Sequence, residues 1–418
     1  MTDQQTAHRI LENIKFKSKD KSEIWALREA QDALIKRSPT KVKHEESTEY
    51  GCETAYCPSC ECVFEEYSDI WGEPFCPHCG QILKPKISVI VPVYNNEDHI
   101  DECLQSIVDQ TLQDIEIIVI NDGSTDRSRH ILHEWEKKDK RIHVINQVNK
   151  GTGASINYGI SIARGEYIAE VDADDFIDPD MYEYLYSIAD GADIVKSGYY
   201  SYYKQGRDYP YSLVKEVQRF CPIELDIMSR FLVFSFQPSY WTAIYKRKFI
   251  WDNQLYWNET PGASFQDTSI IFKMNALCKS MVWTDRSFYH WRVSEPHSIT
   301  SNKWPYAVIY EYACMENFLE EHIEMQLPLR AILSKLRDGT YSWNASRLSG
   351  EEQKTFIEKA AADFERDNDF QDLRFYMDIN RDTGEMLLDR WFRHEAWRRD
   401  PDKYYKLLNK AIAEADND

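Results

Sequence analysis

Long apolar runs and an excess of positive charge are both missing from this chain of 418 residues. No segment stays apolar for the length of a membrane span, and the first residues, Met1–Gln5, lack a signal-peptide core. Asp and Glu outnumber Lys and Arg by 70 to 50, a net charge of −20, which argues against a nucleic-acid surface and a polybasic membrane patch. Internal repeats and low-complexity tracts are absent as well. We therefore expect a cytoplasmic protein that does not bind nucleic acid.

The remaining composition is that of a folded protein with more than one domain. Hydrophobic residues make up 43% of the chain and aromatic residues 13%, which excludes a disordered protein. A chain of this length buries a sizeable core and favours several domains. We expect a helical N-terminal arm and linker, a zinc-ribbon-like module, an α/β domain and a helical C-terminal region. Their boundaries are 1–48, 49–84, 85–301 and 302–418.

Six of the ten cysteines lie between Cys52 and Cys79. Two C-x-x-C pairs, separated by fifteen residues, have the spacing of a zinc ribbon. The predicted zinc ligands are Cys57, Cys60, Cys76 and Cys79. The alternative is a set of unliganded cysteines. A closed four-cysteine site is structural or serves a protein partner, because catalysis needs an open coordination position.

From Ile87 onward, apolar strands alternate with amphipathic helices. This order predicts an α/β fold, a doubly wound and mostly parallel sheet, whose ligands bind at the carboxyl ends of the strands. Polar or aromatic side chains follow the predicted strands at that edge. They are Tyr94, Asp122, Lys150, Asp172, Asp174 and Asp175. After residue 303 the pattern is helical, with Trp304, Val308, Tyr312, Met315 and Leu319 as predicted core positions.

Asp172, Asp174 and Asp175 follow the predicted strand Tyr167–Val171 within four positions. Carboxylates this close stay ionised together only with a cation among them. Oxygen ligands suit Mg²⁺ or Mn²⁺, which commonly also hold a phosphorylated substrate. The alternative is an acidic turn before the helix that starts near Asp178-Pro179.

These motifs resemble the family 2 glycosyltransferases with a GT-A fold. The resemblance runs through Val91–Asn95, Val119–Asp126 and Gly165–Asp175, and less tightly through Phe265–Asp267 to Ser298–Thr300. It covers about half of the chain and leaves out the cysteine pairs and the C-terminal helices. It implies a donor site for a nucleotide sugar. The implied donor-binding residues are Pro92, Tyr94, Asp122, Lys150, Asp172, Ala173, Asp174 and Arg292.

The resemblance also assigns roles at the donor site. Tyr94 matches the aromatic residue beside the base, with core packing as the alternative, and Asp122 matches the carboxylate that binds the uracil imide, with a turn role as the alternative. Asp174 and Asp172 match the D-x-D pair that holds Mn²⁺ or Mg²⁺, Asp172 being also a ribose candidate. His290 is a candidate third ligand, with packing or hydrogen bonding as the alternative.

Asp267 matches the family's general base, which takes the proton of the incoming hydroxyl. Its alternative role is to cap a helix over Thr268–Leu277. Two departures from the family pattern stand out: Gln266 replaces the usual Glu, and Ala154–Asn157 lacks an Arg that many relatives carry. Lys150 is the nearest candidate substitute for that Arg.

The combined expectation is an inverting glycosyltransferase that moves a sugar from a UDP-sugar to a hydroxyl of a glycan or lipid-linked acceptor. A lipid-linked acceptor would place the protein peripherally at the inner membrane face. A nucleotidyltransferase would need a Gly-rich loop after the first strand, where this chain has Asn95-Asn96. The remaining alternative is an adaptor that binds protein partners through the zinc ribbon or the N-terminal helix and carries a weak transferase domain.

Overall fold

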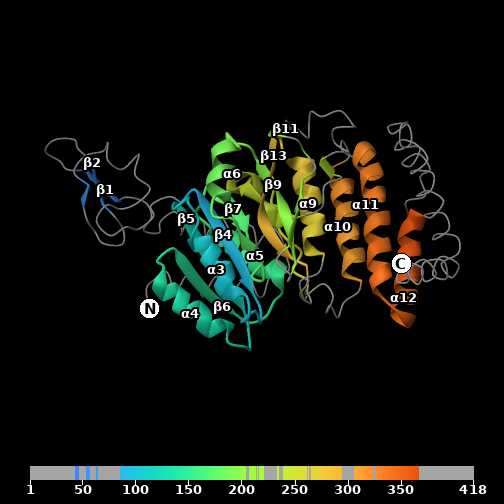
Figure 1. Ribbon diagram of the computed structural model, residues 1–418. Coiled ribbons are helices and arrows are strands. Elements are labelled where there is room, and N and C mark those ends of the chain that lie inside the picture. The colour runs from blue at the N-terminus through green and yellow to red at the C-terminus, as the bar shows by residue number, and fades with distance from the viewer. Residues whose placement is uncertain are drawn as a thin grey trace.

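We describe a computed structural model of the chain (Figure 1). The residues that it describes are 43–46, 53–56, 63–64, 85–203, 207–212, 214, 216–220, 233–234, 239–260, 262, 265–293, 306–322 and 326–366. The four predicted zinc ligands, the predicted core position Trp304 and the end of the predicted helical C-terminal region, 367–418, lie outside these residues, so those expectations stay predictions. The first three described segments are strands that form a small antiparallel sheet. They are β1 (Lys43–Glu46), β2 (Glu53–Tyr56) and β3 (Val63–Phe64).

A ten-stranded mixed sheet forms the centre of the α/β part. Its first half is parallel, in the order β7-β4-β5-β6. These strands are β4 (Ile87–Val93), β5 (Ile115–Asp122), β6 (Ile142–Gln147) and β7 (Tyr167–Glu170). β4 coincides with the apolar run Ile87–Val93, from which the sequence predicts a strand. β5 and β6 each extend two residues beyond the strands predicted at Ile115–Ile120 and Ile142–Ile145. All four carboxyl ends therefore point to one edge of the sheet.

The second half of the sheet mixes strand directions. β12 (Ala243–Lys246) lies antiparallel between β7 and β9 (Ile194–Tyr203), and β13 (Met281–Arg292) runs parallel to β9. Three shorter strands pair antiparallel at the margins. They are β8 (Phe176–Ile177), β10 (Arg207–Tyr211) and β11 (Gln218–Phe220). The long strand β13 thus brings residues after 281 back beside the end of β7.

Helices cover both faces of the sheet, as expected for a doubly wound fold (Figure 1). On one face, apolar side chains of β4 such as Val89 and Val91 pack with α3 (Ile100–Val108), α4 (Ser128–Lys138) and α6 (Met181–Ala189). On the other face, Ile90 packs with a second group of helices. That group is α5 (Thr152–Ile162), α8 (Arg247–Asp252) and α9 (Gln266–Leu277).

The C-terminal helices continue outward from α9 (Figure 1). They are α10 (Ala307–Glu321), α11 (Gln326–Arg347) and α12 (Gly350–Arg366). Val308, Tyr312, Met315 and Leu319 are buried in the core that α10 shares with α9 and α11, so these core predictions are confirmed. Within the described residues, no helix is both long and apolar enough to cross a lipid bilayer.

Candidate functional site

The acidic turn 172–175 connects β7 to β8 and is tied to β13 by its last carboxylate. Asp175 is 2% exposed, and its carboxylate accepts hydrogen bonds from the hydroxyl of Tyr289 at 2.9 Å and from the backbone N–H of Arg292 at 2.8 Å. Its own backbone N–H donates to the Asp172 carbonyl at 3.0 Å, which closes the turn. The sequence left Asp175 without a role. The structure shows that it fixes the turn, while the Asp172 and Asp174 side chains are only half-buried.

The edge of the sheet around this turn carries an excess of negative charge. Burial, followed by the charges of Asp174 and Asp172, raises the pKa of Asp175 well above its usual value. Glu170, the last residue of β7, is 3% exposed, and burial followed by Asp172, Asp175 and Asp267 raises its pKa in the same direction. Sequence reasoning missed Glu170, although a carboxylate inside an otherwise apolar buried strand was a signal for it.

Arg292 holds the acidic turn from the end of β13. Its Nε donates to the Asp174 carbonyl at 2.5 Å, and its guanidinium pairs with Glu102 of α3. The rings of Phe176 and Tyr202 lie 5.1 and 5.2 Å from the guanidinium carbon. The observed bonds of Arg292 go to the turn and to Glu102, and its expected contact with a donor stays a prediction.

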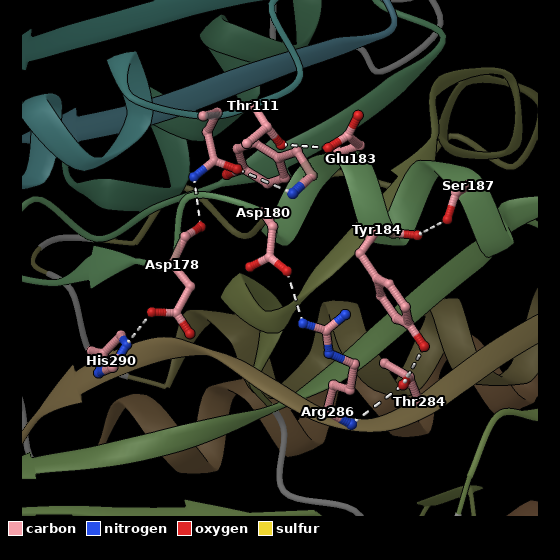
Figure 2. Close-up of polar contacts among 11 residues, drawn as sticks. Thr111, Asp178, Asp180, Glu183, Tyr184, Ser187, Thr284, Arg286 and His290 are labelled. Carbon is pink, nitrogen blue, oxygen red and sulfur yellow. Dashed lines mark hydrogen bonds and ion pairs between the residues drawn. The ribbon is translucent and has the colours of Figure 1, made fainter.

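His290 lies between two aromatic rings and two carboxylates. Its ring stacks on Phe176 at 4.4 Å and on Tyr200 at 4.9 Å. Nε2 lies 3.0 Å from Asp178 Oδ1, as Figure 2 shows, and Nδ1 lies 3.3 Å from Asp208 Oδ2. This geometry favours the alternative of packing and hydrogen bonding, and the metal-ligand role of His290 stays a prediction.

On the nucleotide side, Asp122 shapes the loop that follows β6. It is 3% exposed and accepts hydrogen bonds from the backbone N–H groups of Lys150 at 2.8 Å and Gly151 at 2.9 Å, and from Gln147 Nε2 at 2.8 Å. These bonds go to the end of β6 and the loop after it rather than to the turn at Gly123, so the roles of Asp122 in that turn and at the uracil imide both stay predictions. Tyr94 is 53% exposed, which argues against core packing and leaves a ring face open at the end of β4. Pro92 and the Lys150 side chain are half-buried, and Ala173 packs in the core.

The loops after β4 and β5 are joined by reciprocal hydrogen bonds. Asn95 donates its backbone N–H to Ser124 Oγ at 3.0 Å, and its side-chain oxygen accepts from the N–H of Thr125 at 2.7 Å. Asp126 accepts from the N–H of Glu97 at 3.0 Å. The polar residues of the two motifs therefore fix the loops that carry Tyr94 and Asp122.

Asp267 is the second residue of α9. The helix begins at Gln266 rather than at the expected Thr268, so the interpretation of Asp267 as an N-cap is wrong. The preceding residue, Phe265, has a left-handed backbone with φ of 61°, a strained conformation for a bulky residue that turns the chain into the helix. Burial raises the pKa of Asp267 to about 6, and the nearby cation of Lys196 opposes that rise.

Lys196 on β9 is a second residue that sequence reasoning missed. It is 6% exposed, its ammonium donates to the Ser239 carbonyl, and it lines a small cavity with α9 residues Ile271 and Met274. Burial lowers its pKa to about 7, and the charge of Asp267 opposes that decrease. The charges of Lys196 and Asp267 therefore influence each other, although the contacts of the described residues include no ion pair between them.

Gln266, which replaces the family's usual Glu, joins α9 to α5. Its Oε1 accepts from the backbone N–H of Gly153 at 3.1 Å, and its Nε2 donates to the carbonyl and hydroxyl oxygens of Thr260 at 2.7 and 2.8 Å. The backbone of Asn258 also packs against Gly153, so closely that a Cβ on Gly153 would lie 2.3 Å from the Asn258 carbonyl oxygen. The amide therefore serves to position the start of α9.

Charged side chains of α9 and of the acidic turn influence the same residue at one edge of the sheet. The charge of Asp267 contributes to the raised pKa of Glu170, which also depends on Asp172 and Asp175. Asp267 and the acidic turn therefore act on the same buried carboxylate, although about ninety positions separate them in the sequence, and their roles as base and metal ligands stay predictions. Within the described part of the chain, no group of three or more His, Cys, Asp or Glu side chains is arranged to hold an ion.

Known proteins resemble this chain in sequence and in structure. The profile of glycosyl transferase family 2 matches residues 88–253. Glycosyltransferase GlyG of Streptococcus pneumoniae serotype 4 is 35% identical over 218 residues, which cover 49% of this chain and 70% of GlyG. EpsH of Bacillus subtilis is 35% identical over 213 residues, covering 50% of this chain, but the match spans only 61% of EpsH.

The solved structure of S. aureus TarS residues 1–349 in complex with UDP-GlcNAc superposes with a TM-score of 0.60 at 23% identity. The match covers 79% of this chain and 92% of that structure, and at this identity it shows a shared GT-A fold. The sequence profile and the extensive similarity to GlyG show the family. The chain belongs to glycosyl transferase family 2.

Proposed function

We propose that this protein is an inverting glycosyltransferase that transfers a sugar from a UDP-sugar to a hydroxyl of a glycan or lipid-linked acceptor. The observation that carries the proposal is that Asp267 and the carboxylates of the acidic turn act together on the buried Glu170 at the end of β7. The acidic turn fits a donor diphosphate, and Asp267 supplies a base. The solved complex of TarS with UDP-GlcNAc, which has the same fold, supports UDP as the nucleotide.

In the proposed reaction, Asp267 removes the proton from the acceptor hydroxyl. The acceptor oxygen forms a bond to the anomeric carbon, and the bond from that carbon to the phosphate oxygen breaks. Its electron pair leaves with UDP, and the proton stays on the Asp267 carboxylate. A base works best with a pKa near the operating pH, and the value of about 6 for Asp267 suits that task better than an ordinary carboxylate does.

The donor atoms at the acidic turn fit Mg²⁺ or Mn²⁺ held by Asp172 and Asp174. Such ions need only one or two protein carboxylates when substrate phosphates supply further oxygens, so two half-buried Asp side chains suffice. When bound, the ion would neutralise negative charge on the leaving diphosphate. Tyr289, Arg292 and Asp175 contribute by fixing the turn that carries both carboxylates.

The proposed donor site also includes Tyr94, Asp122 and Lys150. The exposed ring of Tyr94 is available to the base, and Asp122 lies one loop away, at the end of the neighbouring strand. We further propose that Cys57, Cys60, Cys76 and Cys79 bind a structural Zn²⁺ ion. That module would serve a protein partner rather than the reaction.

Calorimetry tests the proposal against the adaptor alternative. UDP should bind in the presence of Mn²⁺ and more weakly after the ion is chelated, whereas an adaptor would show no metal-dependent binding. A hydrolysis screen over UDP-sugars, with wild type and the D267N variant, then identifies the donor without requiring the acceptor. Equal hydrolysis and transfer by D267N and wild type would show that Asp267 is not the base.

A further inference from the structure

A buried carboxylate from the C-terminal helices lies against the first turn of α9. Glu311 of α10 is 1% exposed and accepts hydrogen bonds from Ser269 Oγ and, at 3.0 Å, from Asn258 Nδ2. Asn258 Nδ2 lies within hydrogen-bonding distance of Ser269 Oγ as well, at 3.0 Å. The three side chains therefore form a closed set that joins α10, α9 and the loop 255–260.

Both partners of Glu311 lead to Asp267. Ser269 is two residues beyond Asp267 in the same helix. Asn258 belongs to the loop that contacts Gly153 and, through Thr260, the side chain of Gln266. Glu311 thus holds the helix on one side of Asp267, while Gln266 holds it on the other.

Apolar packing alone does not account for this carboxylate. Glu311 lies on α10 among the buried apolar residues that join this helix to α9, where an ionised group is costly unless it is paired. Burial raises its pKa to about 7, and the charge of Asp267 adds to that rise, so the two carboxylates interact.

We propose that Glu311 is a positioning residue for Asp267, acting through Ser269 and Asn258, and that the C-terminal helices take part in the reaction in this way. The proposal rests on the assignment of Asp267 as the base. Glu311 does not itself touch the substrate. It fixes the first turn of α9, and a base that is displaced by about 1 Å can cost roughly 100-fold in rate.

A double-mutant cycle of E311Q and D267N tests the proposal. Its readouts are hydrolysis of UDP-GlcNAc and the Tm of the four proteins at pH 7. We expect E311Q alone to lower kcat by about 10-fold with less than about a 2-fold change in the donor KM, because the donor contacts stay in place. In the D267N background, E311Q should change kcat by less than about 2-fold, because residues that act as a unit are not additive.

Two further variants complete the experiment. S269A removes the bond to Glu311 without changing a charge, and it should lower kcat in the same direction. E320Q alters an exposed carboxylate on the same helix and should leave kcat and Tm unchanged. Equal effects of E311Q in the wild-type and D267N backgrounds, or a loss confined to the donor KM, would overturn the proposal.

Donor turnover by D267N separates this proposal from the base assignment. If D267N hydrolyses the donor as fast as wild type, the base assignment fails and the role of Glu311 in positioning a base fails with it. A second outcome is that D267N is impaired and the effects of E311Q and D267N add in the double variant, both on Tm and on kcat. In that case the base assignment stands and only the role of Glu311 is lost. The role of Glu311 is supported if the two effects on Tm are not additive and E311Q lowers kcat only when Asp267 is present.

Discussion

The hydroxyl of Tyr289 joins two residues of the acidic turn: it donates to Asp175 at 2.9 Å and accepts the backbone N–H of Asp172 at 3.1 Å. Tyr289 lies on β13, more than one hundred positions after the turn. The ring is fully buried, so both hydrogen bonds are shielded from water. One side chain of a distant strand thus sets the position of the predicted metal-binding carboxylates.

The first prediction concerns this hydroxyl. Y289F should lower the free energy of unfolding by about 1–3 kcal/mol, because the buried Asp175 loses a hydrogen bond to its carboxylate. It should also weaken Mn²⁺-dependent UDP binding, since the turn loses a support. Urea unfolding and calorimetry measure the two effects. The matched control is Y182F, because the buried Tyr182 hydroxyl has no hydrogen-bond partner among the described residues. A loss in the control as large as that in Y289F would contradict the account.

The second prediction concerns the charge of Lys196. Its cation lowers the pKa of Asp267, so K196M should raise that pKa. Because the base must be ionised, the acid limb of kcat/KM for donor turnover should move upward by roughly 0.5–1 pH unit. The measurement is a pH profile from pH 5 to pH 8. K248M, which removes an exposed lysine paired with Asp252, should leave the limb in place. An unchanged limb in K196M would show that the two charges are not coupled.

The third prediction links Asp267 to stability. Its folded-state pKa of about 6 is raised above the ordinary value of 3.8. Its stabilising contribution is therefore complete below the unfolded pKa and is lost as pH rises through about 6. The stability of D267N relative to wild type should consequently increase by roughly 1–3 kcal/mol between pH 4 and pH 7. Denaturant unfolding at several pH values measures this difference, and a difference that does not vary with pH would contradict the raised pKa.

The fourth prediction compares two helical glycines. In G153A the new Cβ would lie 2.3 Å from the Asn258 carbonyl oxygen, so the loop and the start of α9 must shift. We expect a loss of about 1–3 kcal/mol in unfolding free energy, together with lower donor turnover. In G339A the new methyl group meets nothing within 4 Å, and the higher helix propensity of Ala should stabilise α11 by up to about 1 kcal/mol. Similar effects in both variants would argue against the close contact at Gly153.

Residues 87–193 show how much of the fold follows from sequence pattern. Apolar runs such as Ile87–Val93 are buried on both faces and were recognisable as parallel strands. The motifs after these strands also predicted the sheet edge at which Tyr94, Asp122 and Asp174 lie. The alternation of apolar strands and amphipathic helices is a local sequence pattern. It is sufficient to predict the strands of the parallel half of the sheet.

Long-range pairing explains what the sequence did not predict. The Tyr-rich segment 199–203 belongs to β9, whose neighbours β12 and β13 come much later in the chain, so no local pattern indicated its place. Asp175, Glu170 and Glu311 have roles that depend on partners from distant elements. For Asp267 the position in the family motif was informative, but its cap role was misjudged because α9 starts two residues earlier than its apolar pattern.

The most direct test of the account compares D267N and D174N in two assays, donor turnover and Mn²⁺-dependent binding of UDP. D267N should bind UDP like wild type and lose about 100-fold or more in turnover, because a general base contributes that much. D174N should lose metal-dependent UDP binding. If D267N transfers sugar as fast as wild type, or if D174N binds UDP and Mn²⁺ unchanged, the division between base and donor site is contradicted.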